Sequence, residues 1–373
     1  MSMRYKAITL LGIILIFVLA LVHLPSLLTY LVKREIQRNF KGSEVNLEKC
    51  ILKPKEFRLV NFEIKQGDIF SFKTEELNIE FTPLSLLQRE IKKCVAKKGF
   101  FFLNFESFGK GFSGGALPFK IKVLEFKDIN LSLKAKDFDL KAYLFYAELN
   151  PNEELVNFLN LGVNYFSFHG LELKDALLKI NRGAQGSLEI KFISYGKLKV
   201  EDVRGVIQYH HKDKLALKPL SARFLKGYID GEINLELGRE LKYNSNLLFY
   251  QLDMKGIEEA FKLDNKLQLS GLLGGRFVIE GRGYNLEVIK GEFSSLGHGG
   301  TLIIKDKNLV RNLAEKSGQS FDIIWESFKD YHFDEGDIKI FSENRDLILK
   351  IILEGKRGKR GLEIRLHEFE WRR

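Results

Sequence analysis

The stretch Leu188-Glu189-Ile190-Lys191-Phe192 decides the fold class of this chain, because apolar and charged side chains alternate strictly along it. A period of two is typical of a β-strand with one apolar face and one wet face. The same period recurs on both sides of this stretch, at residues 45–51, 57–64, 77–81, 121–123, 131–133, 198–200, 215–217, 233–237, 267–269, 277–279, 338–340, 347–353 and 362–366. The sequence therefore predicts a mainly β fold. Strands do not alternate with long helices, so a parallel α/β sheet is not expected.

Short polar clusters rich in Gly, Asn and Asp separate these segments at hairpin spacing, as in Gln66-Gly67-Asp68 and Tyr195-Gly196-Lys197. Such clusters are turn signals, and they favour an antiparallel sheet. A helical period appears only in short stretches, which we expect to form helices at residues 84–93, 153–160, 257–261, 309–313 and 320–330. The last is the clearest, because Phe321, Ile324, Trp325 and Phe328 follow the i, i+3, i+4, i+7 pattern.

The first 24 residues are predicted to form a membrane anchor. Apart from Arg4 and Lys6, no Lys, Arg, Asp or Glu occurs before Lys33, and a spanning helix needs about 20 apolar residues. The basic residues before the apolar run favour a cytoplasmic N-terminus. A cleaved signal peptide is the alternative, because Val18-Leu19-Ala20 fits a small-residue cleavage site. The anchor core comprises Leu10, Leu11, Ile13, Ile14, Leu15, Ile16, Phe17, Val18 and Leu19.

Residues 25–40 are predicted to form an amphipathic, basic helix after the break expected at Pro25. Leu28, Val32 and Ile36 repeat at helical spacing, with Lys and Arg among them. Such a helix suits the surface of a bilayer. It could also cap the first β-element, and the two interpretations are compatible.

Composition and charge limit the classes of partner. The chain has 373 residues, of which 45% are hydrophobic, so it is not a disordered protein. It carries 59 Lys and Arg against 49 Asp and Glu, a formal net charge of +10. Most of the excess lies in the first 100 residues, where a membrane surface is the expected partner. Nucleic acid is not expected for a chain exported past a membrane. With only two Cys, a disulfide scaffold and a four-cysteine zinc site are excluded.

A search for catalytic motifs leaves no candidate. Gly109-Lys110-Gly111-Phe112-Ser113-Gly114 matches the dinucleotide-binding pattern, but a Gly- and Pro-containing segment follows it where a helix is required. His210 and His211 would face opposite sides of a strand, which makes them poor joint ligands. We therefore predict no catalytic residue, no metal site and no cofactor, and no enzyme activity. Cys50 and Cys94 could pair outside the cytoplasm or remain separate thiols.

The order of several motifs resembles the AsmA-like family of envelope proteins. These motifs are Leu59-Val60-Asn61-Phe62, Phe81-Thr82-Pro83-Leu84-Ser85-Leu86-Leu87 and the segment 215–237. The last third is similar to the YdbH-like branch in Leu269-Ser270-Gly271-Leu272-Leu273-Gly274-Gly275-Arg276-Phe277, Lys290-Gly291-Glu292, Gly299-Gly300-Thr301-Leu302, a helix followed by Tyr331-His332-Phe333-Asp334, and residues 347–355. Together they cover about half of the chain. YdbH-like proteins are much longer, so this chain resembles a shortened version.

The resemblance implies a fold and a role. AsmA-like proteins form a long, curved antiparallel β-sheet, folded like a taco around an apolar groove, and they are implicated in moving phospholipid between the inner and outer membranes. Residues 41–240 would form the AsmA-like part of the groove and residues 241–373 the YdbH-like part, although the division near residue 240 has no linker to mark it. The groove candidates are apolar residues at alternate positions: Leu188, Ile190, Phe192, Leu198, Val200, Ile233, Leu235, Leu237, Phe277, Ile279, Leu347, Leu349 and Ile351.

The expected location is the inner membrane, with a single span and most of the chain in the periplasm. The expected partners are phospholipid and the inner membrane, with an outer-membrane or periplasmic protein, or a second copy, as further candidates. Two other functions remain open. An envelope assembly or scaffold factor would share the fold without carrying lipid. An anchored binding protein for a small ligand, such as a dicarboxylate, would need a closed polar pocket with convergent Arg or Lys.

Overall fold

The structure is a computed structural model that describes residues 26–108, 120–151, 155–181, 185–211, 214–236, 240–283, 285–343 and 346–366. The expected anchor, residues 1–24, lies outside these ranges, as does the Gly-rich loop after residue 108. Within the described ranges, no helix is long and apolar enough to cross a bilayer.

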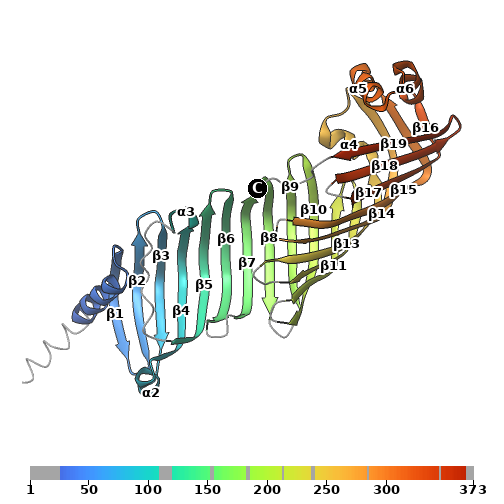
Figure 1. Cartoon of the computed structure of the whole chain (residues 1–373). Helices are drawn as coiled ribbons and strands as arrows, with labels where there is room; N and C mark the ends of the chain where they lie inside the picture. The colour runs from blue at the N-terminus through green and yellow to red at the C-terminus, as the bar shows by residue number, and fades with distance from the viewer. Residues whose placement is uncertain are drawn as a thin grey trace, which may run out of the picture. The chain divides into compact units, whose positions relative to one another are not determined.

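The fold is mainly β, as the alternation predicts: strands make up 72% of the structure, and the 19 described strands belong to one sheet (Figure 1). The chain divides into two compact units, and β8 (Leu171–Asn181) is shared between them. Unit 1 comprises Met1–His169 and Leu178–Arg182, and unit 2 comprises Gly170–Leu177 and Gly183–Arg373. The boundary between these two units falls near residues 170–182.

Unit 1 contains seven strands that pair in chain order, each with the next. Two short helices, α2 (Pro83–Leu87) and α3 (Phe105–Phe108), connect strands within it. The strands are β1 (Glu44–Lys53), β2 (Glu56–Gln66), β3 (Phe70–Glu80), β4 (Glu90–Asn104), β5 (Lys120–Ala135), β6 (Phe138–Asn150) and β7 (Leu155–Phe168).

One pair in unit 1 departs from the antiparallel prediction. Strands β4 and β5 are parallel, with Glu90 opposite Lys120 and Asn104 opposite Lys134. Parallel neighbours need a crossover of about a dozen residues or more, and the segment between these strands is long enough. The antiparallel prediction is wrong at this pair because the strands are joined by a long segment rather than by a two-residue hairpin turn.

Two helix predictions in unit 1 are wrong in whole or in part. The helix expected over residues 84–93 ends at Leu87, and β4 begins at Glu90. Residues 155–160, expected to be helical, belong to β7, where Val156 pairs with Leu149 and Phe158 with Glu148. Val and Phe favour strands when an edge is available for pairing, so the ladder with β6 outweighs a short helical pattern.

Unit 2 pairs in chain order from β9 to β15, after which β15 pairs with both β16 and β17, followed by β18 and β19. The strands are β9 (Gly186–Tyr195), β10 (Leu198–His211), β11 (Lys214–Phe224), β12 (Gly227–Glu236), β13 (Lys242–Asp253), β14 (Leu267–Arg282), β15 (Asn285–Ile304), β16 (Tyr331–Phe333), β17 (Glu335–Glu343), β18 (Asp346–Gly355) and β19 (Gly358–Leu366). The three helices expected here are confirmed as α4 (Met254–Phe261), α5 (Lys307–Ser317) and α6 (Phe321–Phe328).

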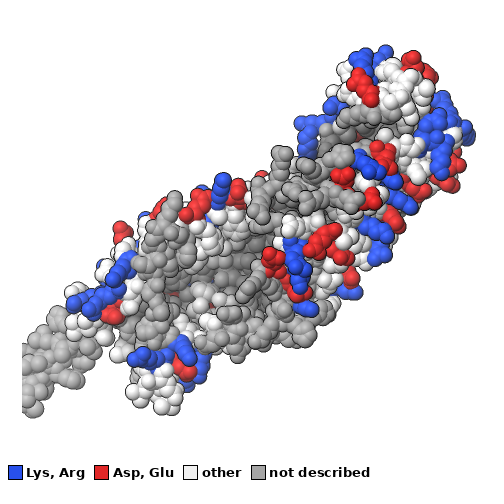
Figure 2. All heavy atoms as spheres, in the orientation of Figure 1, with Lys and Arg blue, Asp and Glu red and all other residues white. Residues whose placement is uncertain are grey.

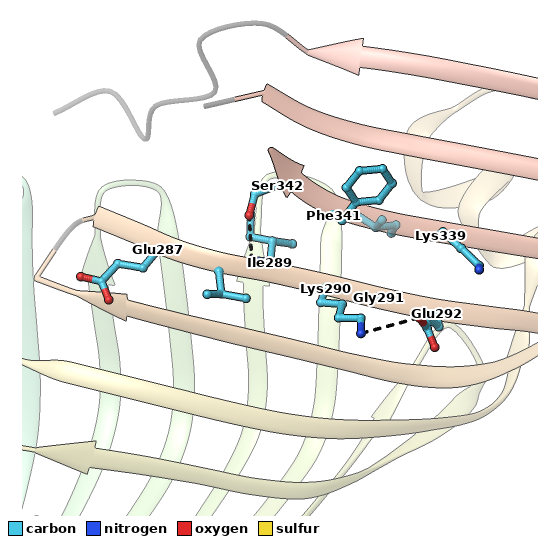
Figure 3. Close-up of a pocket in the computed structure, with 10 residues that line it drawn as sticks. Glu287, Ile289, Lys290, Gly291, Glu292, Lys339, Phe341 and Ser342 are labelled. Atoms are coloured by element: carbon cyan, nitrogen blue, oxygen red, sulfur yellow. Dashed lines mark hydrogen bonds and ion pairs between the residues drawn. The ribbon is translucent and has the colours of Figure 1, made fainter. Parts of the chain in front are cut away.

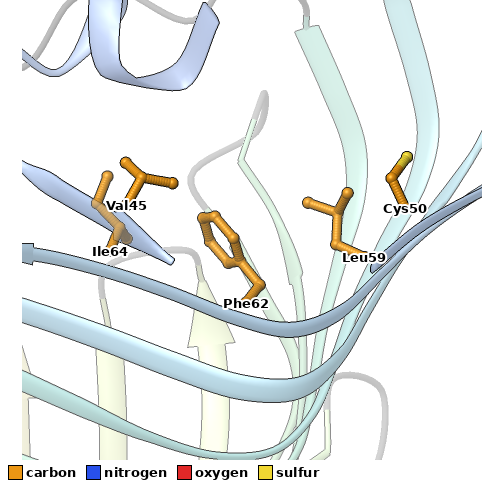
Figure 4. Packing of buried hydrophobic residues seen from close by; sticks show 5 residues of the cluster. All are labelled: Val45, Cys50, Leu59, Phe62 and Ile64. Atoms are coloured by element: carbon orange, nitrogen blue, oxygen red, sulfur yellow. The ribbon is translucent and has the colours of Figure 1, made fainter. Parts of the chain in front are cut away.

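The amphipathic helix expected over residues 25–40 is confirmed for its described part, residues 26–39. Leu28, Val32 and Ile36 pack on a buried cluster of β1 and β2 (Figure 4), formed by Val45, Cys50, Leu59, Phe62 and Ile64. The backbone N–H of Cys50 donates a 3.0 Å hydrogen bond to Thr29 Oγ1. The helix therefore covers one end of the apolar face of unit 1, as the capping interpretation proposed.

A bend crosses the strands of unit 1 at one register position. The ladders from β1 to β6 all lack a pair at this position, which falls at Asn61 in β2, Lys98 in β4 and Asp128 in β5. These three residues have positive φ, of 48°, 49° and 57°. Along β2, the side chains on the apolar face are even-numbered after this position and odd-numbered before it. Leu59 and Phe62, three residues apart, therefore lie on the same side of the strand (Figure 4). The bend keeps the apolar side chains on one face despite the change of parity.

Because Lys98 has positive φ, two substitutions there should affect the free energy of unfolding differently. Lys98→Gly should leave the free energy of unfolding unchanged or raise it, because Gly adopts positive φ without steric cost. Lys98→Val should lower it by about 1–2 kcal/mol, because a β-branched side chain clashes in this conformation. The ion pair of Lys98 with Glu75 is exposed at 3.5 Å and contributes little. Urea denaturation of both variants checks this, and equal midpoints would contradict it.

Candidate functional site

The apolar face of unit 1 is built from rows of side chains that continue from strand to strand. Directly paired residues lie on the same face of a sheet, so a chain of pairs traces a row. Two such rows cross all seven strands, and every member is apolar. The first is Cys50, Leu59, Leu77, Ala96, Phe126, Ala147 and Leu159, and the second is Val45, Ile64, Phe72, Phe101, Leu131, Ala142 and Val163.

The opposite face of unit 1 is polar and charged. One row on it contains Val60, Glu76, Lys97, Lys127, Tyr146 and Asn160. Neighbouring charges on this face form ion pairs, such as Lys97 with Glu76 at 3.4 Å. Unit 1 therefore separates an apolar face from a charged face over its whole width.

Unit 2 also has an apolar face built from such rows. One row on its apolar face contains Leu188, Gly205, Leu220, Gly231, Leu247, Phe277, Gly291, Ile340, Leu349 and Ile364. A second contains Ala222, Ile229, Phe249, Gly275, Phe293, Ile338, Ile351 and Leu362. The rings of Phe249, Phe277 and Phe293 are neighbours, with centroids 5.5–6.4 Å apart. No charged residue interrupts either row.

Most of the predicted groove residues lie on the apolar face of unit 2. Leu188, Phe277, Leu349 and Ile351 belong to the two rows above. Others share their strands and parity with row members: Ile190, Ile233, Leu235, Ile279 and Leu347. Leu198 and Val200 precede the point in β10 at which the ladder lacks a pair. They lie opposite Tyr195 and Ile193, on the same face as the other groove candidates. Leu237 lies outside the described residues.

Phe192 lies on the opposite face, contrary to the prediction. It pairs with Glu201, is 37% exposed, and has Lys191 Nζ 5.4 Å from its ring centroid. The ladder between β9 and β10 lacks a pair at Asp202, whose φ is 48°. The parity changes there as it does in unit 1, so Ile193 takes the inward position that the alternation had assigned to Phe192.

The rows of unit 1 are functional candidates that the sequence did not single out. Their signal is weak because Phe100, Phe101 and Phe102 are all apolar and give no alternation. Ala96 and Ala147 are also small enough to be overlooked in a search for Leu, Ile and Phe. Only the register of the ladders shows that they continue a single apolar surface.

The two apolar faces are covered to different extents: in unit 1 the helix over residues 26–39 packs on one end, and row members such as Cys50, Ala96 and Ala147 are buried. In unit 2, α4 packs against β13 and β14, and α5 and α6 against β15. Elsewhere in the described part of unit 2, no helix makes an extensive contact with a strand. Row members such as Leu247, Phe277 and Leu349 stay half-buried. The apolar face of unit 2 can therefore take up further apolar material.

A shallow surface pocket of about 390 Å³ lies between β15 and β17 (Figure 3). Ser342 Oγ accepts a 3.1 Å hydrogen bond from the N–H of Ile289 at its floor. Lys290 Nζ lies 3.9 Å from Glu292 Oε1, and Glu292 faces Lys339 across the ladder. Its cations are therefore matched by a neighbouring carboxylate rather than converging on an open centre. It is not the closed polar pocket that a small anionic ligand would require.

Both cysteines are free and buried. Burial raises the pKa of the Cys50 thiol and of the Cys94 thiol to about 11. Both thiols are thus protonated at neutral pH, which makes them poor nucleophiles. Among the residues that the structure describes, no group of His, Cys, Asp and Glu is arranged to hold a metal ion.

The charged face of unit 1 contains one buried carboxylate, Glu125, which is 3% exposed. Its Oε1 lies 2.5 Å from Lys93 Nζ and its Oε2 lies 3.2 Å from Lys127 Nζ. Burial acts to raise the pKa of this carboxyl, but hydrogen bonds and charge from the two lysines outweigh it, so the pKa is lowered. Glu125 therefore anchors the charged face across β4 and β5.

Glu125 should make unit 1 sensitive to acid. Because its pKa is lowered in the folded state, its contribution is complete above the unfolded value of about 4.3 and is lost as pH falls through the lower folded value. Glu125→Gln should lower the free energy of unfolding by about 2 kcal/mol at pH 7, because two lysines lose their partner. The difference from the parent chain should vanish near pH 2. Urea denaturation across this range checks it, and a pH-independent difference would contradict it.

Comparison of the chain with protein-family models, with curated proteins and with solved structures found no match. The residues that carry a function must therefore be identified from the geometry of the structure. The most extensive feature of the described residues is the pair of apolar sheet faces.

Proposed function

We propose that this chain is a lipid-transfer protein whose apolar sheet faces shelter phospholipid acyl chains from water during transport between the inner and outer membranes. The observation that carries the proposal is the continuity of the rows, which cross seven strands in unit 1 and ten in unit 2 without a charged member. A core needs apolar residues too, but it needs a second layer to cover them, and in unit 2 row members such as Leu247 and Leu349 stay half-buried.

The energetics favour an elongated apolar ligand. Each methylene transferred from water to an apolar surface contributes about 0.8 kcal/mol. Because row members such as Leu247 and Leu349 are half-buried, contact with acyl chains would remove their remaining exposure. No residue has to recognise a particular atom of the lipid, so the lipid can move along a row from one strand to the next. The headgroup stays in water, and no charge enters the apolar face.

The resemblance to AsmA-like proteins supports this proposal. In this proposal, residues 1–24 hold the chain in the inner membrane, the β region lies in the periplasm, and phospholipid and the inner membrane are the partners. The basic helix over residues 26–39 follows the proposed span and packs on β1 and β2, which connects the anchor to the apolar face of unit 1.

Native mass spectrometry of the full chain, purified from membranes in mild detergent, tests the proposal together with lipid extraction. We expect several phospholipids per chain, with little selectivity for headgroup. A chain free of lipid that takes up none from vesicles would overturn the proposal and favour the scaffold function. A single tightly bound polar ligand would favour the binding-protein function instead.

A further inference from the structure

One end of unit 1 carries an exposed apolar tip that the proposed lipid-binding faces do not use. Helix α2 connects β3 to β4, and its three leucines point away from the sheet. Leu84 is 65% exposed, Leu86 39% and Leu87 83%. Large apolar side chains this exposed and this close together mark an interaction surface in a soluble domain.

The tip is held in a fixed shape. Thr82 Oγ1 accepts a hydrogen bond from the N–H of Ser85, and Ser85 Oγ accepts one from the N–H of Thr82, at 3.2 Å and 2.8 Å. This reciprocal capping box, with Pro83 at the first helical position, stabilises a helix of only five residues. Ser85 itself is buried, so the leucines on either side of it are directed outward.

Basic residues surround the tip. The N–H of Phe81 donates to the carbonyl of Lys55, and the N–H of Lys120 donates to the carbonyl of Arg89, at 3.1 Å and 2.9 Å. Lys55, Arg89 and Lys120 are exposed and make no ion pair with the described residues. Figure 2 shows an uncharged tip at α2, with blue side chains and a smaller red area above it.

The acidic residues at this end are largely neutralised by basic partners. Glu56 lies 3.4 Å from Lys53 and 3.1 Å from Arg58, and Glu90 lies 2.9 Å from Lys122. Glu80 faces Lys93 across the ladder, although the ion pair of Lys93 is with Glu125. The surface therefore presents apolar side chains ringed by positive charge, which is complementary to a bilayer that contains anionic phospholipid.

The helix over residues 26–39 carries a second exposed apolar surface toward the same end of unit 1. Phe40 lies beside the start of β1, whereas Thr29 lies at Cys50, near the end of β1. The start of this helix is therefore directed toward the end of unit 1 that carries α2. Leu27, Tyr30 and Leu31, in its first turns, are 54%, 60% and 48% exposed. Two exposed apolar surfaces thus occur toward the same end of unit 1.

We propose that the α2 tip is a membrane-docking surface, at which Leu84, Leu86 and Leu87 enter the interface of an anionic bilayer and Lys55, Arg89 and Lys120 contact its phosphates. The proposal does not depend on lipid cargo, since a scaffold protein could dock in the same way. Docking would fix this end of unit 1 at the bilayer surface.

A fluorophore at the tip tests the proposal in the full chain reconstituted in vesicles of phosphatidylethanolamine and phosphatidylglycerol. The label is attached at Leu87→Cys, and Cys50 and Cys94 are buried and react poorly. The matched control is Asp68→Cys, in the β2–β3 turn at the opposite end of the strands. Brominated acyl chains should quench the label at residue 87 at least about fivefold more than the label at residue 68.

The charge ring supplies the second arm of the experiment. Lys55→Gln combined with Arg89→Gln should reduce quenching at residue 87 by about threefold or more on anionic vesicles and have little effect on phosphatidylcholine vesicles. Equal quenching at residues 87 and 68 would overturn the proposal, whatever the lipid content of the chain. Energy transfer between copies labelled at residue 87 in the absence of vesicles would instead assign the tip to contact with a second copy.

Discussion

Replacing Leu349 by glutamate should remove at least about half of the lipid that co-purifies with the chain, without unfolding it. Leu349 lies in the middle of β18, between Ile340 and Ile364 in the first row of unit 2, and is half-buried. A carboxylate there retains enough access to water to stay charged. Acyl chains crossing the row would have to desolvate it or leave a gap, and both weaken binding. Lipid extraction and native mass spectrometry of the variant measure the loss.

The same strand supplies the control. Ile352 is 39% exposed on the opposite face of β18, where it pairs with Asp337. Ile352→Glu introduces the same charge three residues away and should leave the lipid content unchanged. Ile190 is a poorer test site in unit 2 because it is only 7% exposed, and a charge there would unfold the chain before lipid could be measured. Equal lipid content in Leu349→Glu and Ile352→Glu would refute the assignment of the apolar face.

The face to which each residue belongs could be predicted only where the alternation continues without a break. Along β12 and β18 it does, and Ile233, Leu235, Leu347 and Leu349 lie on the face that the period assigns. At Phe192 it does not, because the conformation of Asp202 on the neighbouring strand changes the parity. A period of two contains no information about a partner strand, so this reversal could not be read from local sequence.

Pairing explains the other differences as well. The pattern of residues 155–160 is compatible with a helix, and only the edge of β6 selects a strand. The parallel pair β4–β5 depends on a long crossover rather than on any feature of the two strands. The rows of unit 1 exist only because the registers of six successive ladders agree. Local elements were therefore largely predictable, whereas the continuous apolar surface is a property of register.

At α2 the local sequence predicted the element, but the fold explains only some of its residues. The sequence of the segment Phe81–Leu87 resembles a connector between strands, and the segment does connect β3 to β4. The capping box between Thr82 and Ser85 accounts for its polar positions, since their side chains satisfy the first turn. The fold does not account for Leu84 and Leu87, which bury little. The exposed leucines are therefore the part of this motif for which a partner must be sought.

A second motif, Tyr331-His332-Phe333-Asp334, is explained by packing alone. Tyr331 is 0% exposed and Phe333 1% exposed, whereas His332 between them is exposed. The hydroxyl of Tyr331 donates to the carbonyls of Leu353 and Gly358, at 3.2 Å and 2.6 Å. These contacts fasten the three-residue strand β16 to β18 and to the start of β19. The motif therefore stabilises unit 2 and lies outside the apolar rows.

Phe333→Ala should accordingly lower the stability of unit 2 by about 3–5 kcal/mol, the usual cost of removing a buried aromatic ring. The site cannot readily collapse around the cavity, because its walls are glycines without side chains to fill it. A Cβ on Gly300 would lie 2.8 Å from the Phe333 ring and one on Gly336 would lie 3.3 Å from it. Tyr331→Phe, which removes only the hydroxyl, should cost about 1 kcal/mol.

Hydrogen exchange distinguishes a local role from a global one, because it reports stability strand by strand. In Phe333→Ala, the amides of β15, β17 and β18 should lose protection by several orders of magnitude, whereas those of β2 to β5 in unit 1 should keep theirs. The lipid bound per folded chain should also remain close to that of the parent, because Phe333 belongs to neither row. A loss of protection below about tenfold would contradict the packing role, since a filled cavity of this size is worth more than 1.4 kcal/mol. A variant that stays folded but carries no lipid would show instead that β16 contributes to lipid binding.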